Sequence, residues 1–336
     1  MKKKLLKPPK NKEILIIPSC QKIKSICAKS KQILSAHQPG FFNPGVALKF
    51  LILEKFSSEK RVIFVDTDKI DLSLNLNTVQ DNLAVSFQKN STLFDLPNPS
   101  KKEWINFFRE LKFKLEKRKI SGKIIGNIDN FKAIILADKR KKLKTVLADS
   151  FLKFYRLNFN YSYLSDELNL KDYKDFWLKI YKNCEQFQKV FNKALDDYKQ
   201  EFKFRFKNFP FPKLKKDELP FWIIKNNKRL KLFKNDLRVE DFDREIIFPR
   251  ACTLTIFLRL YRSDCFVHGV GGKNYEWLND RIIEVFFKRK SPFYLTISGT
   301  FLAEGITNRD IPFFFLSPNY LKDQLNLFLK KEDEEK

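Results

Sequence analysis

The pattern of apolar and polar positions predicts a βαβ unit near the start of the chain. Residues 33–35 and 61–65 are short apolar runs typical of strands, and residues 14–17 form another. Between the two main runs, Asn43, Pro44 and Gly45 open a helical segment, because proline is favoured in the first helical turn. The apolar face of this segment is broad. It comprises Val46, Leu48, Phe50, Leu51, Ile52 and Leu53.

The middle of the chain changes character. Residues 70–100 are polar and irregular, with many Asn, Ser and Pro residues. Apolar spacing then predicts helices at residues 101–117, 130–137, 142–155 and 172–203. After a Phe-Pro loop at 208–212, residues 218–224 and 230–233 indicate a hairpin.

The last third returns to alternating helix and strand signals. A helix is expected over 250–262, a strand over 265–267, a helix over 274–288, a strand over 294–298 and a further helix within 311–330. We therefore predict an α/β fold with a Rossmann-like parallel-sheet core and a helical insertion. The expected divisions are 1–75 for the first part of the core, 76–215 for a mainly helical insertion, and 216–336 for the second part of the core with a glycine loop and a C-terminal helix.

The two histidines of the chain, His37 and His268, each stand at a predicted strand-to-helix turn. Ligands of open α/β sheets bind beyond the carboxyl ends of the strands, and histidine is suited to proton transfer near neutral pH. We expect the two turns to form halves of one site; two unrelated core or surface histidines are the plain alternative. Gln38 and Gly40 complete the first turn.

Two aspartates, Asp66 and Asp68, follow the second core strand. Alternation along a strand places both on one face, where they are expected near His37. There they would orient a substrate amine, hold a metal or act as a base, whereas capping of a helix by either one is the structural alternative.

The segment after His268 is rich in glycine, with Gly269, Gly271, Gly272 and then Lys273. Glycines allow positive φ and close approach of backbone N–H groups to a ligand, so the segment is a candidate cradle for a phosphate or carboxylate, or else a tight turn. It is not a Walker A loop, because the hydroxyl residue required after the lysine is absent.

Arginine is scarce but clustered. About five of the 15 arginines lie between residues 244 and 281. Because the guanidinium fork fits carboxylate and phosphate, Arg250 and Arg281 are candidate anion clamps that Asp264 and Asp280 would orient. Ordinary salt bridging is the alternative.

The net charge of +26 does not by itself indicate a nucleic-acid-binding protein. Lysine outnumbers arginine about 51 to 15 and phenylalanine is abundant at 36, a combination that an AT-rich genome favours, and the lysines are dispersed. No apolar run approaches the roughly 18–20 residues of a membrane span. The apolar run before Cys20 is too short for a signal peptide, about four residues against roughly 7–15. Five cysteines without metal-type spacing fit a reducing compartment, so we expect a cytoplasmic protein.

Taken in order, the turn "HQxGxxxPGxxxK", the strand "VIFVDTDKID" and the segment "FVHGVGGKNYEWLND" give the chain a resemblance to the cysteine-adding enzyme family of bacillithiol biosynthesis. It is more similar still to uncharacterised bacterial relatives that keep histidine in both loops. Asn192 and Trp222 lie in further segments that echo this family, and Tyr275 lies in the last motif.

The resemblance implies a core related to class I nucleotidyltransferases and a ligase-like reaction. That reaction condenses an amino acid, cysteine in the family, with an amino-sugar-type acceptor, with ATP or ADP as the expected cofactor and no metal. The chain departs from the family at His37, in the lack of a Pro-Gly-Glu element after His268, and in the reduced C-terminal coiled coil. Non-catalytic nucleotide or sugar binding, nucleic-acid binding and a metallohydrolase built on His37, Asp66, Asp68 and His268 remain alternatives. The oligomeric state is not predicted.

Overall fold

A computed structural model describes residues 14–17, 30–40, 44–56, 59–67, 69–70, 73–77, 82–86, 91–117, 122–203, 211–225, 228–299 and 318–334. Within these residues the main sheet has six strands. Their spatial order is β1 (Ile14–Ile17), β13 (Phe293–Gly299), β12 (Cys265–His268), β2 (Gln32–His37), β3 (Glu59–Phe64) and β8 (Asn160–Tyr163). All neighbours pair in parallel except β1, which runs antiparallel to β13 at the edge. The Rossmann-like α/β fold predicted from the sequence is confirmed.

The chain reverses its direction of travel across the sheet at β2. From β2 it moves to β3 and then β8 on one side, and later returns to place β12 and β13 on the other. The boundary between β2 and β12 is therefore the topological switch point of the sheet, which is the place where open α/β folds bind ligands. His37 ends β2 and His268 ends β12.

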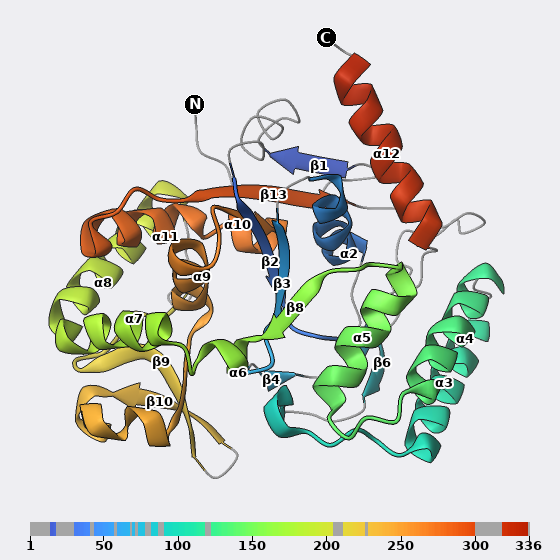
Figure 1. The fold of residues 1–336 in the computed structure, drawn as a ribbon, viewed down its shortest axis with the longest axis horizontal. Helices are drawn as coiled ribbons and strands as arrows, with labels where there is room; N and C mark the ends of the chain where they lie inside the picture. The colour runs from blue at the N-terminus through green and yellow to red at the C-terminus, as the bar shows by residue number, and fades with distance from the viewer. Residues whose placement is uncertain are drawn as a thin grey trace.

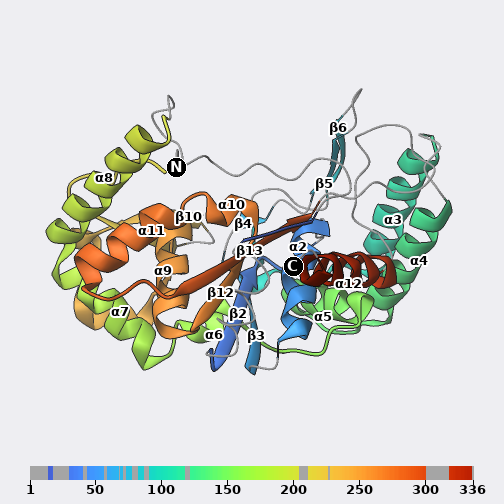
Figure 2. The same ribbon diagram turned by 90° about the horizontal axis from the view of Figure 1, so that it is seen from above.

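Alternating strand residues enter two separate hydrophobic cores, as the two-residue period of a strand requires. Val62 and Phe64 of β3 pack in one core, whereas Ile63 and the following Val65 pack in the other. Figure 2 shows the helices divided in the same way. The first face is covered by α2 (Pro44–Leu51), α5 (Leu143–Tyr155) and α12 (Pro318–Glu334), and the second by α7 (Lys171–Lys182), α8 (Cys184–Glu201), α9 (Ala251–Tyr261) and α11 (Glu276–Ile282).

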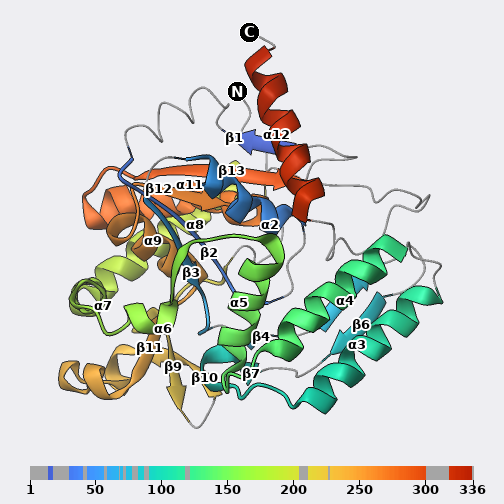
Figure 3. The ribbon, with the colours of Figure 1, turned by 45° about the vertical axis from the view of Figure 1, so that its right-hand side comes forward.

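Helices α3 (Lys101–Glu116) and α4 (Gly122–Ala137) form an antiparallel pair to one side of the sheet (Figure 3). Ser100 begins α3 with a capping box: its Oγ accepts from the Glu103 N–H, and the Glu103 carboxylate accepts from the Ser100 N–H at 2.7 Å. The region expected to be irregular contains two small antiparallel pairs. These are β4 (Lys69–Ile70) with β7 (Ser91–Thr92), and β5 (Ser73–Asn77) with β6 (Asn82–Ser86).

The predicted hairpin forms as β9 (Glu218–Lys225) and β10 (Lys228–Phe233), and a third strand, β11 (Ile246–Pro249), extends it into a small sheet beneath α9 (Figure 1). The remaining short elements are α6 (Leu164–Glu167), α10 (Val270–Lys273), 3-10 turns at Ile52–Lys55, Leu93–Asp95, Lys234–Asp236 and Val239–Arg244, and a π-helical turn at Ile283–Phe287.

Two local predictions were wrong. The helix expected over 172–203 is two helices, α7 and α8, separated at Asn183. Residues 270–273, expected to be a loop, form the short helix α10. Strand β8 was not predicted, because its four residues, rich in Tyr, do not show an apolar run. None of the helices in the described part of the chain is both long and apolar enough to cross a bilayer.

Candidate functional site

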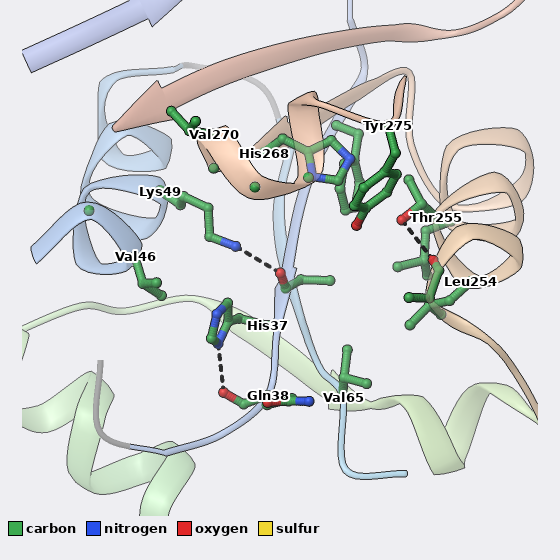
Figure 4. A pocket seen from close by; sticks show the side chains of 18 of the residues that line it. His37, Gln38, Val46, Lys49, Val65, Leu254, Thr255, His268, Val270 and Tyr275 are labelled. Atoms are coloured by element: carbon green, nitrogen blue, oxygen red, sulfur yellow. Dashed lines mark hydrogen bonds between the residues drawn. The ribbon is translucent and has the colours of Figure 1, made fainter. Parts of the chain in front are cut away.

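A cavity of about 500 Å³ opens at the switch point, beyond the carboxyl ends of β2, β3, β12 and β13 (Figure 4). His37 and Gln38 line it from β2, and His268 lines it from β12. Because side chains alternate along a strand, the two histidine side chains point from opposite faces of the sheet. Both still reach the cavity, because each histidine is the last residue of its strand. The prediction that the two turns contribute to one cavity therefore agrees with the geometry.

Lys49 of α2 also lines this cavity, and it is almost fully buried, with 4% of its surface exposed. Its Nζ donates to the carbonyl oxygen of Ala36 at 3.0 Å. Burial lowers the pKa of Lys49 to about 7. Among the described residues that line the cavity there is no aspartate or glutamate. A buried cation that faces a cavity without described carboxylates is chemically able to bind an anion.

His37 stands below Lys49 in the same cavity, as Figure 4 shows. Its Nδ1 donates to the Gln38 carbonyl oxygen at 3.0 Å, which selects the tautomer with the proton on Nδ1 when the ring is neutral. Burial and the nearby Lys49 ammonium lower the pKa of His37. The neutral ring is therefore the resting state at neutral pH, so Nε2 is a proton acceptor there.

His268 is held by a buried carboxylate. Its Nε2 lies 2.6 Å from Oε1 of Glu276, the first residue of α11, and that glutamate is fully buried. Asn279 Nδ2 donates to the same oxygen at 3.0 Å. Burial, opposed by Glu276 and assisted by Lys49, lowers the pKa of His268. Nε2 lies beside the carboxylate without the alignment of a hydrogen bond. Nδ1 is the other ring nitrogen, which accepts a proton in the tautomer protonated on Nε2.

The carboxylate of Glu276 is itself paired with Arg259 of α9, which is 1% exposed. Arg259 also donates to Asp280 Oδ1 at 2.8 Å and to the Pro292 carbonyl oxygen at 2.5 Å. Although burial opposes ionisation, His268 and Arg259 hold the pKa of Glu276 below its usual value. Arg259, Glu276 and His268 thus form a buried chain that ends at the cavity, and such a chain fixes the orientation of the imidazole.

The glycines after His268 have a role different from the predicted one. Gly269 has a φ of −85° and caps α10, and Gly271 and Gly272 lie inside that helix. A Cβ on Gly272 would lie 2.2 Å from His268 Nδ1, whereas a Cβ on Gly271 would meet nothing within 4 Å. Gly272 is therefore required for the close approach of the imidazole to the helix, and the expected positive φ plays no part. Lys273 does not line the cavity; its Nζ lies 5.6 Å from the centre of the Tyr294 ring.

Asp66 follows β3, two residues after Phe64, but it does not line the cavity. It is fully buried, and its carboxylate accepts from Lys144 Nζ at 2.5 Å, from Ser165 Oγ at 2.6 Å and from the Ser165 N–H at 3.0 Å. These bonds join β3 to α5 and α6. Asp66 therefore has a structural role in this arrangement, and Asp68 lies outside the described residues.

The predicted anion clamps are placed apart from the two histidines. Arg250 precedes α9 and pairs with the buried Glu218 at 2.8 Å, while its guanidinium lies 4.3 Å from the centre of the Trp222 ring. Arg281 is exposed on α11. Asp264 orients neither arginine, because it accepts from the N–H groups of residues 31 and 32 at the opposite end of the sheet. Asp280, instead, is the partner of Arg259.

Of the other predicted binding residues, one lines this cavity and the rest lie elsewhere. Tyr275 lines the cavity, with its ring centre 6.2 Å from that of His268. Gly40 has open space beside it and does not line the cavity. Asn192 clamps the backbone of Leu214 through both of its amide atoms at 2.9 Å. Trp222 lines a second cavity, described below.

Three residues at the site were not predicted: Lys49, Glu276 and Arg259. Each carried a signal in the sequence. Lys49 ends the turn motif itself, and Arg259 is a single cation inside an otherwise apolar helix. Glu276 had the weakest signal, since an acidic residue in the first turn of a helix is common.

Within the described residues, no three His, Cys, Asp or Glu side chains gather in a way that would hold a metal ion. A scan of the chain against models of known protein families matched none of them, and a search of curated proteins found no match either.

Proposed function

We propose that this protein is an enzyme that binds a phosphate-bearing nucleotide, ATP or ADP, in the cavity between β2 and β12. The proposed reaction is a ligase-like condensation of an amino acid with an amino-sugar-type acceptor. The observation that carries the proposal is the composition of the cavity: a buried lysine and two histidines face it, and no described lining residue is acidic. The identity of the two reactants rests on the resemblance of the sequence motifs.

The residues present fit a phosphate group. Lys49 supplies a cation whose hydrogen-bond acceptor among the described residues is the Ala36 carbonyl oxygen. The first turn of α2 contributes Gly45 and Val46 to the lining and contains no acidic residue, so the positive end of the helix dipole is uncompensated there. A bound nucleotide would supply a phosphoryl group for activating a carboxylate.

The proton transfers of a condensation fall to the histidines. The amine that attacks a carboxylate activated by the phosphoryl group forms the amide bond, displaces phosphate and loses a proton. His268 Nδ1 is the acceptor best prepared for that proton, because Glu276 stabilises the imidazolium that forms. His37 Nε2 is a second acceptor on the other side of Lys49. Lys49 holds the anion, so that the negative charge of the substrate stays at one end of the cavity.

A thermal-shift screen at moderate salt tests the binding. The ligands are ATP, ADP, CTP, cysteine, amino-sugar conjugates and a short DNA duplex. A ligand at about 100 times its Kd stabilises the protein by about 2.7 kcal/mol. We expect ATP or ADP to produce such a shift in the wild type and in Arg281→Gln, an exposed control, but not in Lys49→Met.

Turnover of any ligand pair identified in this way tests the chemistry. His268→Ala should reduce kcat by about 10²–10⁴ while nucleotide binding persists. Nucleotide binding without turnover in the wild type would establish the non-catalytic alternative. A shift with DNA alone, equal in the wild type and Lys49→Met, would refute the proposed function and favour nucleic-acid binding through the basic surface.

A further inference from the structure

A second cavity, of about 340 Å³, adjoins the first. Gln38 and Ala251 line both, so the two cavities meet where β2 ends and α9 begins. Most of the second lining is apolar and much of it is aromatic, with Phe191, Phe211 and Trp222 among its residues. Its volume is sufficient for a ring-sized organic group.

The charged residues of this second cavity are all cationic. Arg229, Lys231 and Arg250 line it, and no described lining residue is acidic. Glu218 lies behind the wall, 1% exposed, where it contacts Arg250 Nη1 at 2.8 Å and Lys231 Nζ at 3.1 Å. The guanidinium groups of Arg229 and Arg250 lie 4.7 and 4.3 Å from the centre of the Trp222 ring. A cation entering this cavity would meet three like charges, and Glu218 is already paired with two of them.

Arg250 is the best positioned of these cations. Its Nε donates to the Phe221 carbonyl oxygen at 3.2 Å, its backbone N–H to the Pro220 carbonyl oxygen at 3.1 Å, and its Nη1 to Glu218. These bonds fix the guanidinium in place. Its buried Nη2 has no hydrogen-bond partner among the described residues. A fixed guanidinium group that lines the cavity is prepared to bind an oxyanion.

We propose that the second cavity binds an organic acid that combines a ring with a carboxylate or phosphate and carries no ammonium group. The oxyanion would lie on Arg250 and the ring against Phe211 and Trp222. A free amino acid is disfavoured here, because its ammonium would face the like charges of Arg229, Lys231 and Arg250, and no described lining residue is a carboxylate. This inference does not rest on the proposed function, because both reactants of the proposed condensation carry an amine and neither is the acid inferred here.

Four small probes that differ in one feature at a time test this inference. Phenylacetate and phenyl phosphate carry the ring with a carboxylate or a phosphate, L-phenylalanine adds an ammonium, and benzyl alcohol lacks the anion. In isothermal titration and saturation-transfer NMR, we expect one or both acids to bind at least tenfold more tightly than L-phenylalanine and benzyl alcohol. Comparison of the two acids shows which oxyanion the site prefers. Equal binding of phenylacetate and L-phenylalanine would overturn the inference.

Variants locate the bound probe. Arg250→Lys keeps a cation beside Glu218 but removes the fork, and should weaken the preferred acid at least tenfold. Phe211→Ala should weaken it as well, and it provides an independent variant if thermal unfolding shows Arg250→Lys to be misfolded. Lys49→Met is the matched control and should leave this binding unchanged. Loss of binding in Lys49→Met, or its persistence in both other variants, would place the acid elsewhere and refute the proposal.

The same variants separate this inference from the proposed function. If ADP fails to bind, or binds equally to the wild type and Lys49→Met, the proposed function is refuted, while binding of the acid that depends on Arg250 would still establish the second cavity.

Discussion

Two buried lysines on the same face of the sheet have opposite environments. Lys144 of α5 is 6% exposed and lies 2.5 Å from Asp66 Oδ2 and 3.1 Å from Ser165 Oγ. Lys49 of α2 is 4% exposed and donates to a single carbonyl oxygen, with a cavity rather than a carboxylate in front of it. The residues around Lys144 include a carboxylate that pairs with it, whereas the described residues that line the cavity in front of Lys49 include none.

In the proposed function, this difference separates the candidate ligand site from structural ion pairing. Burial of a charge is costly in both places. At the end of β3 the cost is offset inside the protein by Asp66. At the switch point it is offset in part by loss of the proton, since burial lowers the pKa of Lys49 to about 7, and a bound anion would offset it further. Asp66, which the sequence suggested as a site residue, is instead the structural partner of Lys144.

The largest expected effect comes from removing each lysine in turn. Lys144→Met leaves Asp66 buried and unpaired, which should lower the free energy of unfolding by about 3–5 kcal/mol. Lys49→Met leaves no charge unpaired and should keep or raise it. Urea denaturation of the two variants measures the difference. Equal losses would show that Lys49 has a structural partner after all.

A smaller effect is expected from the glycines of α10. Gly272→Ala brings a Cβ within 2.2 Å of His268 Nδ1, so the ring or the helix must move. This overpacking should cost about 1–3 kcal/mol of stability and reduce any turnover. Gly271→Ala, which has open space beside it, is the matched control and should gain a few tenths to about 1 kcal/mol from helix propensity. If the two variants behave alike in thermal unfolding and activity, the close packing of His268 against α10 is not needed.

The smallest effect is the pH dependence of nucleotide binding. An anion favours protonated Lys49, so binding raises a pKa that is about 7 in the free protein. Affinity is therefore full below that pH and falls as the pH rises through it, by up to about tenfold, or about 1.4 kcal/mol, per pH unit. Titrations of ADP between pH 7 and 9 measure this slope. Lys49→Arg, which stays protonated, should remove it; an unchanged slope in that variant would assign the titration to another group.

The fold was largely predictable because its signals are local. The strands at residues 33–35, 61–65, 265–267 and 294–298 are apolar runs bounded by turns, and all were found close to their predicted positions. Strand β8 was not predictable in this way, since Asn160–Tyr163 contains no such run and becomes a strand through pairing with β3. The break between α7 and α8 at Asn183 also depends on packing, because the apolar spacing continues across it.

The site was predictable only in part. His37 and His268 could be placed at one cavity because strand ends and topology bring them there. Whether a polar residue faces that cavity or a neighbouring helix depends on contacts between segments distant in the chain. Asp66 with Lys144, and Arg250 with Glu218, are such contacts, and no local pattern revealed them.

The sequence by itself determined the α/β class, the alternation of strands and helices along the chain, and the two histidine turns at the strand ends. It did so because hydrophobic periodicity and turn residues act over a few neighbouring positions. The tertiary structure alone decided which charges are paired. It closed Asp66 against Lys144, linked His268 to Glu276 and Arg259, and left Lys49 facing the cavity. The physical reason is that electrostatic pairing depends on distance in space and on burial, and both are set only when the helices pack on the two faces of the sheet.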